Sequence, residues 1–331
     1  MARPRFLPDN FTLWLIAVVL LASLLPARDQ VAEVVGWITN FAIGLLFFMH
    51  GAKLSRAAIW AGATHWRLHL LVFACTFGMF PLLGVVLRPA LAPLMGDELY
   101  LGMLFLCALP ATVQSAIAFT SLARGNVAAA VCSAATSSML GIFITPLLVI
   151  LLLGADAGSG DTLGAIGQIT VQLLLPFVAG QIARRWIGNW VERNKSWLKS
   201  VDQGSILLVV YCAFSDAVVE GLWHSIPLLQ LAGLVVACCV LLAVVLLLVE
   251  LLARRLGFNV EDRITILFAG SKKSLATGVP MAQVLFAGGS MGAMILPLMV
   301  FHQIQLMVCA VLAERYARRP EAEVAAAVPE R

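Results

Sequence analysis

Ten apolar runs, each close to the length of a membrane-spanning helix, constrain the fold of this chain more than any other feature. A helix needs about 20 mostly apolar residues to cross the hydrocarbon core of a bilayer. Hydrophobic residues make up 61% of the sequence and charged residues 12%, with a mean hydropathy of +0.95, which is more apolar than a soluble core requires. We therefore predict an all-α polytopic membrane protein with about ten transmembrane helices in the lipid bilayer. The runs lie at residues 11–26, 35–52, 68–88, 99–123, 127–153, 164–185, 204–219, 226–253, 264–287 and 290–313.

The first run also has features of a signal peptide. Arg3 and Arg5 precede it, and it ends in two leucines followed by Pro26 and Ala27. Cleavage there would leave nine spans and would remove the symmetry between the two halves of the chain. We expect the run to be retained as the first helix.

Basic residues lie almost entirely on one side of the predicted membrane. When the N-terminus is placed inside, eighteen lysines and arginines fall on the same side, and Arg28 and Arg88 fall on the other. The positive-inside rule then predicts that both termini are cytoplasmic. Because topology explains the net charge of +4, we expect no nucleic-acid partner.

The ten runs divide into two halves of five. The polar stretch from Gly154 to Asp161 separates them. An odd number of spans in each half makes the second half enter the membrane from the opposite side, which is the inverted-repeat plan of many secondary transporters. We predict a first inverted repeat at residues 1–155, a second at residues 156–319, and a disordered cytoplasmic tail at residues 320–331.

The fourth and ninth runs are each interrupted near the middle. Pro110 stands in one, among polar residues, and Gly270 begins a polar segment in the other. Proline and glycine weaken a helix, and freed backbone groups are tolerated in a membrane only where protein or a cavity satisfies them. At about 1.5 Å per residue, both breaks lie well inside a core about 30 Å thick. We predict that the two broken helices cross near the midplane.

Two adjacent lysines, Lys272 and Lys273, lie in the second break. An unpaired ammonium in hydrocarbon costs roughly 2.5–3.5 kcal/mol, which favours a binding site. The alternative is that both lysines lie near a helix end and extend to water. Hydroxylated residues also serve helix packing, and a histidine in the tenth run is either a packing residue or a proton relay. The candidate substrate and ion site consists of Thr112, Gln114, Ser115, Ser133, Thr136, Ser137, Lys272, Lys273, Ser274 and His302.

Enzyme and metal chemistry find no support in the sequence. The seven cysteines all lie in apolar runs, which suggests neither disulfides nor a metal cluster. No nucleotide-binding motif is present, and we expect no acidic residue at the depth of the two lysines that could act as a catalytic base. We expect no enzymatic activity, no catalytic residues and no metal.

Local motifs resemble those of the bile acid:sodium symporter family over nearly the whole chain. They are the stretch Ala123-Arg124-Gly125-Asn126, the pair Thr145-Pro146 and the segment from Gly270 to Ser274. The sequences around both breaks are similar to those of one divergent branch of that family, the branch that includes its seventh vertebrate member. The resemblance implies a bacterial homologue in the inner (plasma) membrane. It also implies a core domain of helices 3–5 and 8–10, a panel domain of helices 1, 2, 6 and 7, and a substrate between them.

The chain departs from the family at residues that bind sodium. The ninth span of the family carries Glu-x-Gly-x-Gln-Asn, and matching on Gly270 puts Phe268 at the Glu, Lys272 at the Gln and Lys273 at the Asn. We predict that the ammonium of Lys272 replaces sodium by donating to the crossover carbonyls, while Lys273 faces the substrate. Proton coupling through Lys272 would then be possible, and the alternative is that sodium still binds through backbone carbonyls.

These observations predict a secondary active transporter that moves an organic anion by alternating access. Candidate substrates are a bile acid, a steroid conjugate or a small carboxylate, because the predicted site is basic. The alternative is a membrane regulatory or scaffold protein that has kept the fold and does not transport.

Overall fold

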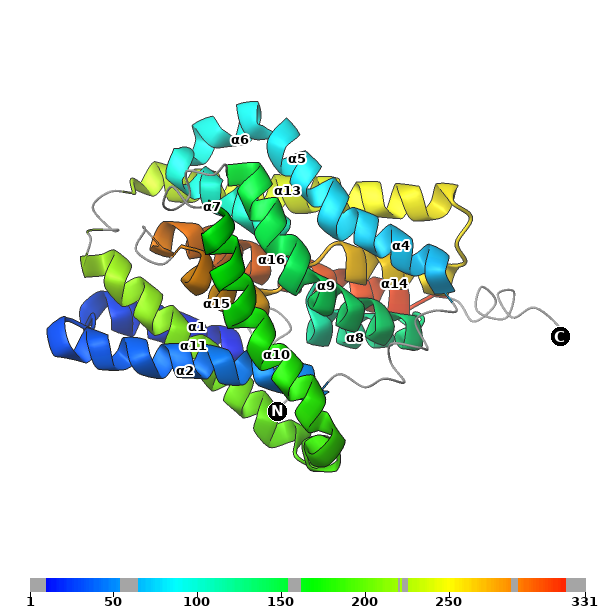
Figure 1. Cartoon of the computed structure of the whole chain (residues 1–331). Coiled ribbons are helices and arrows are strands. Elements are labelled where there is room, and N and C mark those ends of the chain that lie inside the picture. Colours follow the sequence, from blue (N-terminus) through cyan, green and yellow to red (C-terminus); the bar gives the residue numbers. More distant parts are fainter. Residues whose placement is uncertain are drawn as a thin grey trace, which may run out of the picture.

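The computed structural model describes residues 10–53, 65–153, 162–219, 221, 226–286 and 291–319, and within them every regular element is a helix (Figure 1). The first half contains α1 (Asn10–Leu24), α2 (Asp29–Lys53), α4 (Trp66–Phe73), η2 (Ala74–Met79), α5 (Phe80–Val86), α6 (Arg88–Met95), α7 (Asp97–Ala108), α8 (Val113–Leu122) and α9 (Val127–Leu153). The second half contains α10 (Thr162–Arg193), α11 (Lys195–Val219), α13 (Leu228–Arg255), α14 (Val260–Gly270), α15 (Leu275–Leu285) and α16 (Met291–Ala317). The predicted tail at 320–331 lies outside the described residues.

Each of the ten predicted runs coincides with helix over its described part, so the all-helical fold class is confirmed. By length and apolarity, six helices in the described part of the chain can cross a membrane, or seven when the bent pair α7 and α8 is counted as one span. The arrangement of ten spans as inverted repeats stays a prediction. Several helices are longer than the runs that predicted them, because their first or last turns are polar. The clearest case is α11, which begins at Lys195.

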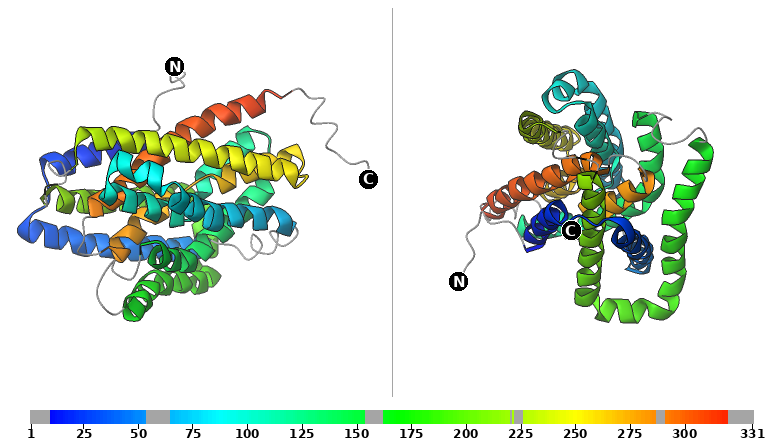
Figure 2. Two further views of the ribbon diagram at one scale, coloured as in Figure 1. Left: turned by 90° about the horizontal axis from the view of Figure 1, so that it is seen from above. Right: turned by 90° about the vertical axis from the view of Figure 1, so that its left-hand side faces the viewer.

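Four helices pack chiefly on one another. The α2 helix runs along α10, and α11 lies between α1 and α2 (Figure 2). The approach of α2 to α10 requires glycine, because a Cβ at Gly51 would lie 2.0 Å from the carbonyl oxygen of Phe177. The remaining helices form a second group, in which α16 packs on α7, α8 on α9, and α13 on α6 and α16.

The third predicted span is one helix with a widened turn in its middle. It comprises α4, the π-helical segment η2 and α5. Pro81 follows the widened turn, and a proline within a helix has no N–H and clashes with the preceding turn. A π-turn accommodates it, and such turns leave backbone groups free for other partners.

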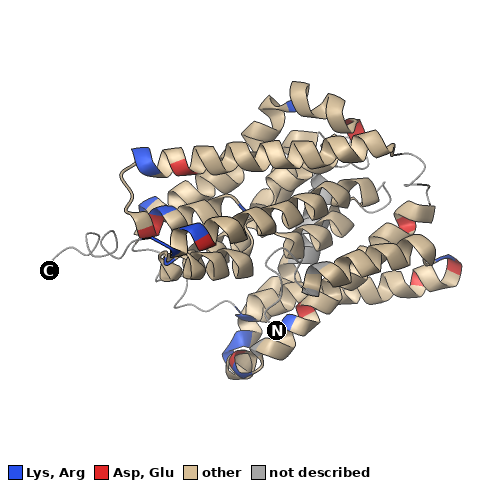
Figure 3. Cartoon of the chain, turned by 180° about the vertical axis from the view of Figure 1, so that it is seen from behind, with Lys and Arg blue, Asp and Glu red and all other residues tan. Residues whose placement is uncertain are grey.

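The surface is that of an integral membrane protein. Large apolar side chains stand exposed on the outer faces, including Leu24, Trp37, Leu228 and Leu229, which lipid rather than water suits. Charged residues gather toward the ends of the bundle, and many of the lysines and arginines lie at the end that contains the last turn of α16 (Figure 3). The cytoplasmic placement of the termini stays a prediction.

Candidate functional site

The breaks in the two interrupted helices lie against each other. The first is the gap between α7 and α8, which are bent by 66°, and the second separates α14 from α15. The backbone N–H of Ser274 donates to the carbonyl oxygen of Pro110 at 3.0 Å. The hydroxyl of Thr112 donates to the carbonyl oxygen of Lys273 at 2.8 Å. The two breaks are therefore in direct contact, and their position near the membrane midplane stays a prediction.

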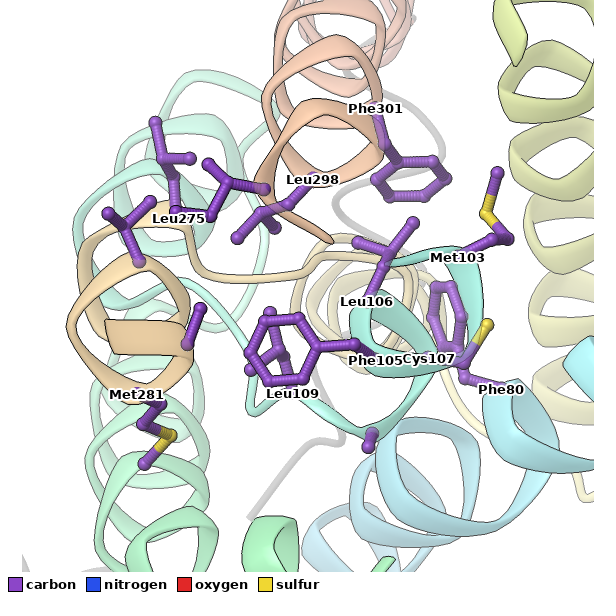
Figure 4. Packing of buried hydrophobic residues seen from close by; sticks show 14 of the residues in the cluster. Phe80, Met103, Phe105, Leu106, Cys107, Leu109, Leu275, Met281, Leu298 and Phe301 are labelled. Atoms are coloured by element: carbon purple, nitrogen blue, oxygen red, sulfur yellow. The ribbon is translucent and has the colours of Figure 1, made fainter. Parts of the chain in front are cut away.

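Side chains from α9 form hydrogen bonds with the backbone groups that the first break leaves without helical partners. The end of α7 leaves carbonyls without helical partners, and Pro110 supplies no N–H. Thr145 donates its hydroxyl to the carbonyl oxygen of Ala108 at 2.9 Å, and the hydroxyl of Ser137 accepts from the N–H of Ala111 at 3.1 Å. These bonds explain why hydroxylated residues occur in the fifth apolar run. Apolar contacts close the rest of the junction, with Phe105 and Leu109 between α7 and α15 (Figure 4).

Lys273 is buried, and three backbone carbonyls surround its ammonium group. Its Nζ donates to the carbonyl oxygens of Thr76, Cys107 and Leu109 at 2.7, 2.8 and 2.7 Å. The ring of Phe80 lies beneath it, with Nζ 4.1 Å from the ring centroid. An ammonium has three donors, so its hydrogen-bonding capacity is filled.

The carbonyls that bind Lys273 are free because of the local backbone. In the widened turn η2, the N–H of Phe80 donates to Cys75 rather than to Thr76. In a π-helix the carbonyl of Thr76 would accept from the N–H of residue 81, but this residue is Pro81, which has no N–H. Cys107 lies at the C-terminal end of α7, where the helix dipole is negative. The π-turn of one span and the broken end of another thus create an acceptor site for a cation.

A buried glutamine fixes the backbone of Lys273. Gln305 on α16 accepts from the N–H of Lys273 at 3.0 Å and donates to its carbonyl oxygen at 2.9 Å. The same amide nitrogen lies 2.9 Å from Nδ1 of His302, and that Nδ1 lies 3.5 Å from the carbonyl oxygen of Lys273. These contacts tie α16 to the extended segment between α14 and α15.

Lys272 points away from Lys273 into an aromatic pocket. Its Nζ lies 3.8 Å from the ring centroid of Phe119 and 5.7 Å from that of Phe268, and it has no hydrogen-bond partner among the described residues. Residues 272–274 have no helical structure, so successive side chains point to opposite sides rather than turning by 100°. The roles predicted for the two lysines are therefore wrong. Lys273 donates to the carbonyls, and neither lysine faces the cavity described below.

A cavity of about 420 Å³ lies where α1, α2, α10 and α11 face α8, α9, α15 and α16. Five of the predicted site residues line it, namely Thr112, Gln114, Ser115, Ser274 and His302. The other five lie elsewhere. Ser133 is hydrogen-bonded to His69 at 2.6 Å, and Thr136 donates to the carbonyl of Cys132 on its own helix at 2.8 Å. Ser137 and Lys273 bind backbone groups at the crossover, and Lys272 lies in its aromatic pocket, so the prediction that all these residues line one cavity is wrong for half of them.

The cavity also contains polar groups that the predicted site did not include. The hydroxyls of Ser138 and Thr277, like that of the predicted residue Ser115, are buried in its wall without hydrogen-bond partners among the described residues. Its charged residues come from the ends of α2 and α11, outside the apolar runs that predicted those helices, and are Lys53, Lys199 and Asp202. The titratable residue His50 also lines the cavity, but it lies inside the run at 35–52. A signal was present in the sequence, because charged residues flanked both runs, but nothing indicated that they meet.

A transporter family model matches this chain, and two of the relatives described here are transporters by name. The model of the SBF-like CPA transporter family matches residues 9–318. A protein of Escherichia coli, YfeH, whose name proposes a symporter, is 59% identical over 313 residues, which cover 95% of this chain and 94% of YfeH. Sodium/bile acid cotransporter 7 of Mus musculus is 30% identical over 284 residues, or 83% of this chain and 82% of the mouse protein. An uncharacterized protein of Pseudomonas aeruginosa is 72% identical over 330 residues, with 100% and 99% coverage.

The family match covers every described helix. The names of the relatives indicate a transporter rather than an enzyme. This chain belongs to the SBF-like CPA transporter family, which is related to the bile acid:sodium symporters.

Proposed function

We propose that this protein is a secondary transporter that moves an amphipathic organic anion by alternating access. The panel would consist of α1, α2, α10 and α11, and the core of the remaining helices. The position of the cavity carries this proposal, because it lies between these two groups and is lined by the residues that flank both helix breaks. Motion of panel against core would expose those residues first to one side of the membrane and then to the other.

The lining of the cavity suits a substrate with an apolar body and an anionic group. Phe47, Phe177 and Met139 supply apolar surface, and the unpartnered hydroxyls can bind polar substituents. Lys199 is exposed at the cavity and adds positive charge near its mouth. A bile acid, a steroid conjugate or a small apolar carboxylate has this combination. The name of the mouse relative, a sodium/bile acid cotransporter, supports the same class.

Sodium is not required as a coupling ion in this proposal. The ammonium of Lys273 lies among carbonyls that would otherwise need a bound cation, and Phe268 replaces the acidic residue that the family resemblance implies for sodium. A lysine in this position can supply the crossover carbonyls with a cation without a bound ion. Coupling must then come from elsewhere in the cavity.

Uptake into proteoliposomes tests the transport function. We expect saturable uptake of at least one labelled anion from a panel of bile acids, sulfated steroids and small carboxylates. The uptake should not change when sodium is replaced by choline. If no anion gives saturable flux under sodium, proton or potential gradients, the protein is instead a non-transporting regulatory or scaffold protein.

Two substitutions on α9 provide a matched comparison. Ser138→Ala removes an unpartnered hydroxyl from the cavity wall, so it should raise the KM of uptake. Thr136→Ala removes a hydroxyl that bonds within its own helix outside the cavity, so it should leave KM unchanged. Equal effects of the two changes would argue that this cavity does not bind the substrate.

A further inference from the structure

Asp202 is the one acidic side chain among the described residues that line the cavity. It lies on α11 and is buried, and its Oδ2 accepts from Nζ of Lys53 on α2. Its other oxygen, Oδ1, is also buried and has no hydrogen-bond partner among the described residues. A buried carboxylate requires counter-charge and hydrogen bonds. Among the described residues, Lys53 alone supplies counter-charge within hydrogen-bonding distance of Asp202.

Lys53 is accessible to a substrate in the cavity. The side chain of Lys53 is 29% exposed to solvent, whereas that of Asp202 is 9% exposed. Lys199 precedes Asp202 by three residues on the same helix, so both side chains lie on one face of α11. An anion that reaches the mouth of the cavity therefore meets two ammonium groups, one of which is already paired with Asp202.

Few other titratable groups face this pair. On α2, His50 lines the cavity with Nδ1 2.8 Å from the carbonyl oxygen of Leu46. On α10, Arg184 donates to the carbonyl oxygen of Ala52, and on α16 His302 lines the opposite part of the wall. The described lining residues of α1, α8, α9 and α15 include no ionisable side chain.

We propose that the pair of Lys53 and Asp202 couples anion binding to the uptake of one proton, an inference that rests on the proposed transport function. The anionic group of the substrate replaces the carboxylate of Asp202 on the ammonium of Lys53. Asp202, buried and without counter-charge, then takes up one proton from the solution on the side to which the cavity is open. The pair, the anion and the proton carry zero net charge together, both before and after binding. Release on the other side of the membrane reverses both steps, and the result is electroneutral symport of one anion with one proton.

Infrared spectroscopy tests the proton step without any substrate. Lys53→Met removes the counter-charge as an arriving anion would, so Asp202 should be protonated at neutral pH. We expect the carbonyl stretch of a protonated carboxylic acid in this variant, its absence from wild type, and its loss when Asp202→Asn is added. The control Lys53→Met with Glu192→Gln should keep the band, because Glu192 is an exposed acid paired with Arg184. If folded Lys53→Met shows no such band, the proposal is wrong; Lys53→Gln provides the same comparison should the methionine variant misfold.

Flux measurements test the coupling itself. An inward gradient of one pH unit can drive about tenfold accumulation of an anion that moves with one proton, since tenfold corresponds to about 1.4 kcal/mol. Wild type should approach this value at zero membrane potential for the anion transported in the uptake assay. Asp202→Asn should only equilibrate that anion across the membrane, and accumulation by this variant would overturn the proposal. Saturable flux without the infrared band would refute the coupling pair alone, whereas the band without flux of any anion would refute the transport function and the coupling with it.

Discussion

Replacing Lys273 by methionine should destabilise the protein severely. Methionine has a similar reach but no donor, so the carbonyls of Thr76, Cys107 and Leu109 would stay buried without partners. A buried acceptor that loses its partner costs about 1–3 kcal/mol, so three such carbonyls cost roughly 3–9 kcal/mol. Because folded domains are stable by only about 5–15 kcal/mol, we expect poor recovery of folded protein or a large fall in melting temperature.

The adjacent residue supplies the control. Lys272→Met removes an ammonium that has no hydrogen-bond partner and keeps an apolar side chain beside Phe119. It forfeits a cation–π contact of about 0.5–2 kcal/mol, and removing an unpaired buried amine offsets part of that loss. We expect a melting temperature close to that of wild type.

Thermal unfolding of purified protein in detergent, followed by intrinsic fluorescence, compares the two variants directly. The reasoning predicts that the substitution at 273 is far more damaging than that at 272, although the residues are identical and adjacent. Equal losses, or a greater loss at 272, would show that the carbonyl site does not stabilise the crossover.

Three further predictions concern packing and ions. Gly180→Ala should lower the melting temperature, because the added Cβ would lie 1.9 Å from the carbonyl oxygen of Phe48. Gly44→Ala should leave it unchanged, because a Cβ there has no atom within 4 Å, and equal effects of the two changes would contradict this packing. Asn126→Ala removes a donor to Asp262 and the cap of α9, so it should lower the free energy of unfolding by about 1–2 kcal/mol in a denaturant titration, and an unchanged value would count against it. Exchanging choline for sodium at constant ionic strength should not shift the melting temperature, and a large sodium-specific stabilisation would refute replacement of the ion by a lysine.

The sequence was sufficient to predict the long apolar helices and the positions of the breaks, but it did not predict the short helix α6 between the third and fourth runs. Length and apolarity determine which segments suit a bilayer, and these are local properties of the chain. The same holds for the breaks, because Pro110 removes an N–H wherever the helix packs and the segment from Gly270 to Ser274 is polar within an apolar run. Contact between the breaks followed from their similar depth in the membrane.

Only the tertiary structure decided what each polar side chain contacts. The extended backbone at residues 272–274 sends the two lysines in opposite directions, so helical periodicity assigned them the wrong roles. Free carbonyls for Lys273 depend on a π-turn some 200 residues earlier in the chain, at Thr76. Lys53 and Asp202 are 149 residues apart and lie just outside their apolar runs, so no local pattern relates them. Local chemistry fixes where a membrane helix forms and where it breaks, whereas the partner of a buried charge depends on how distant helices pack.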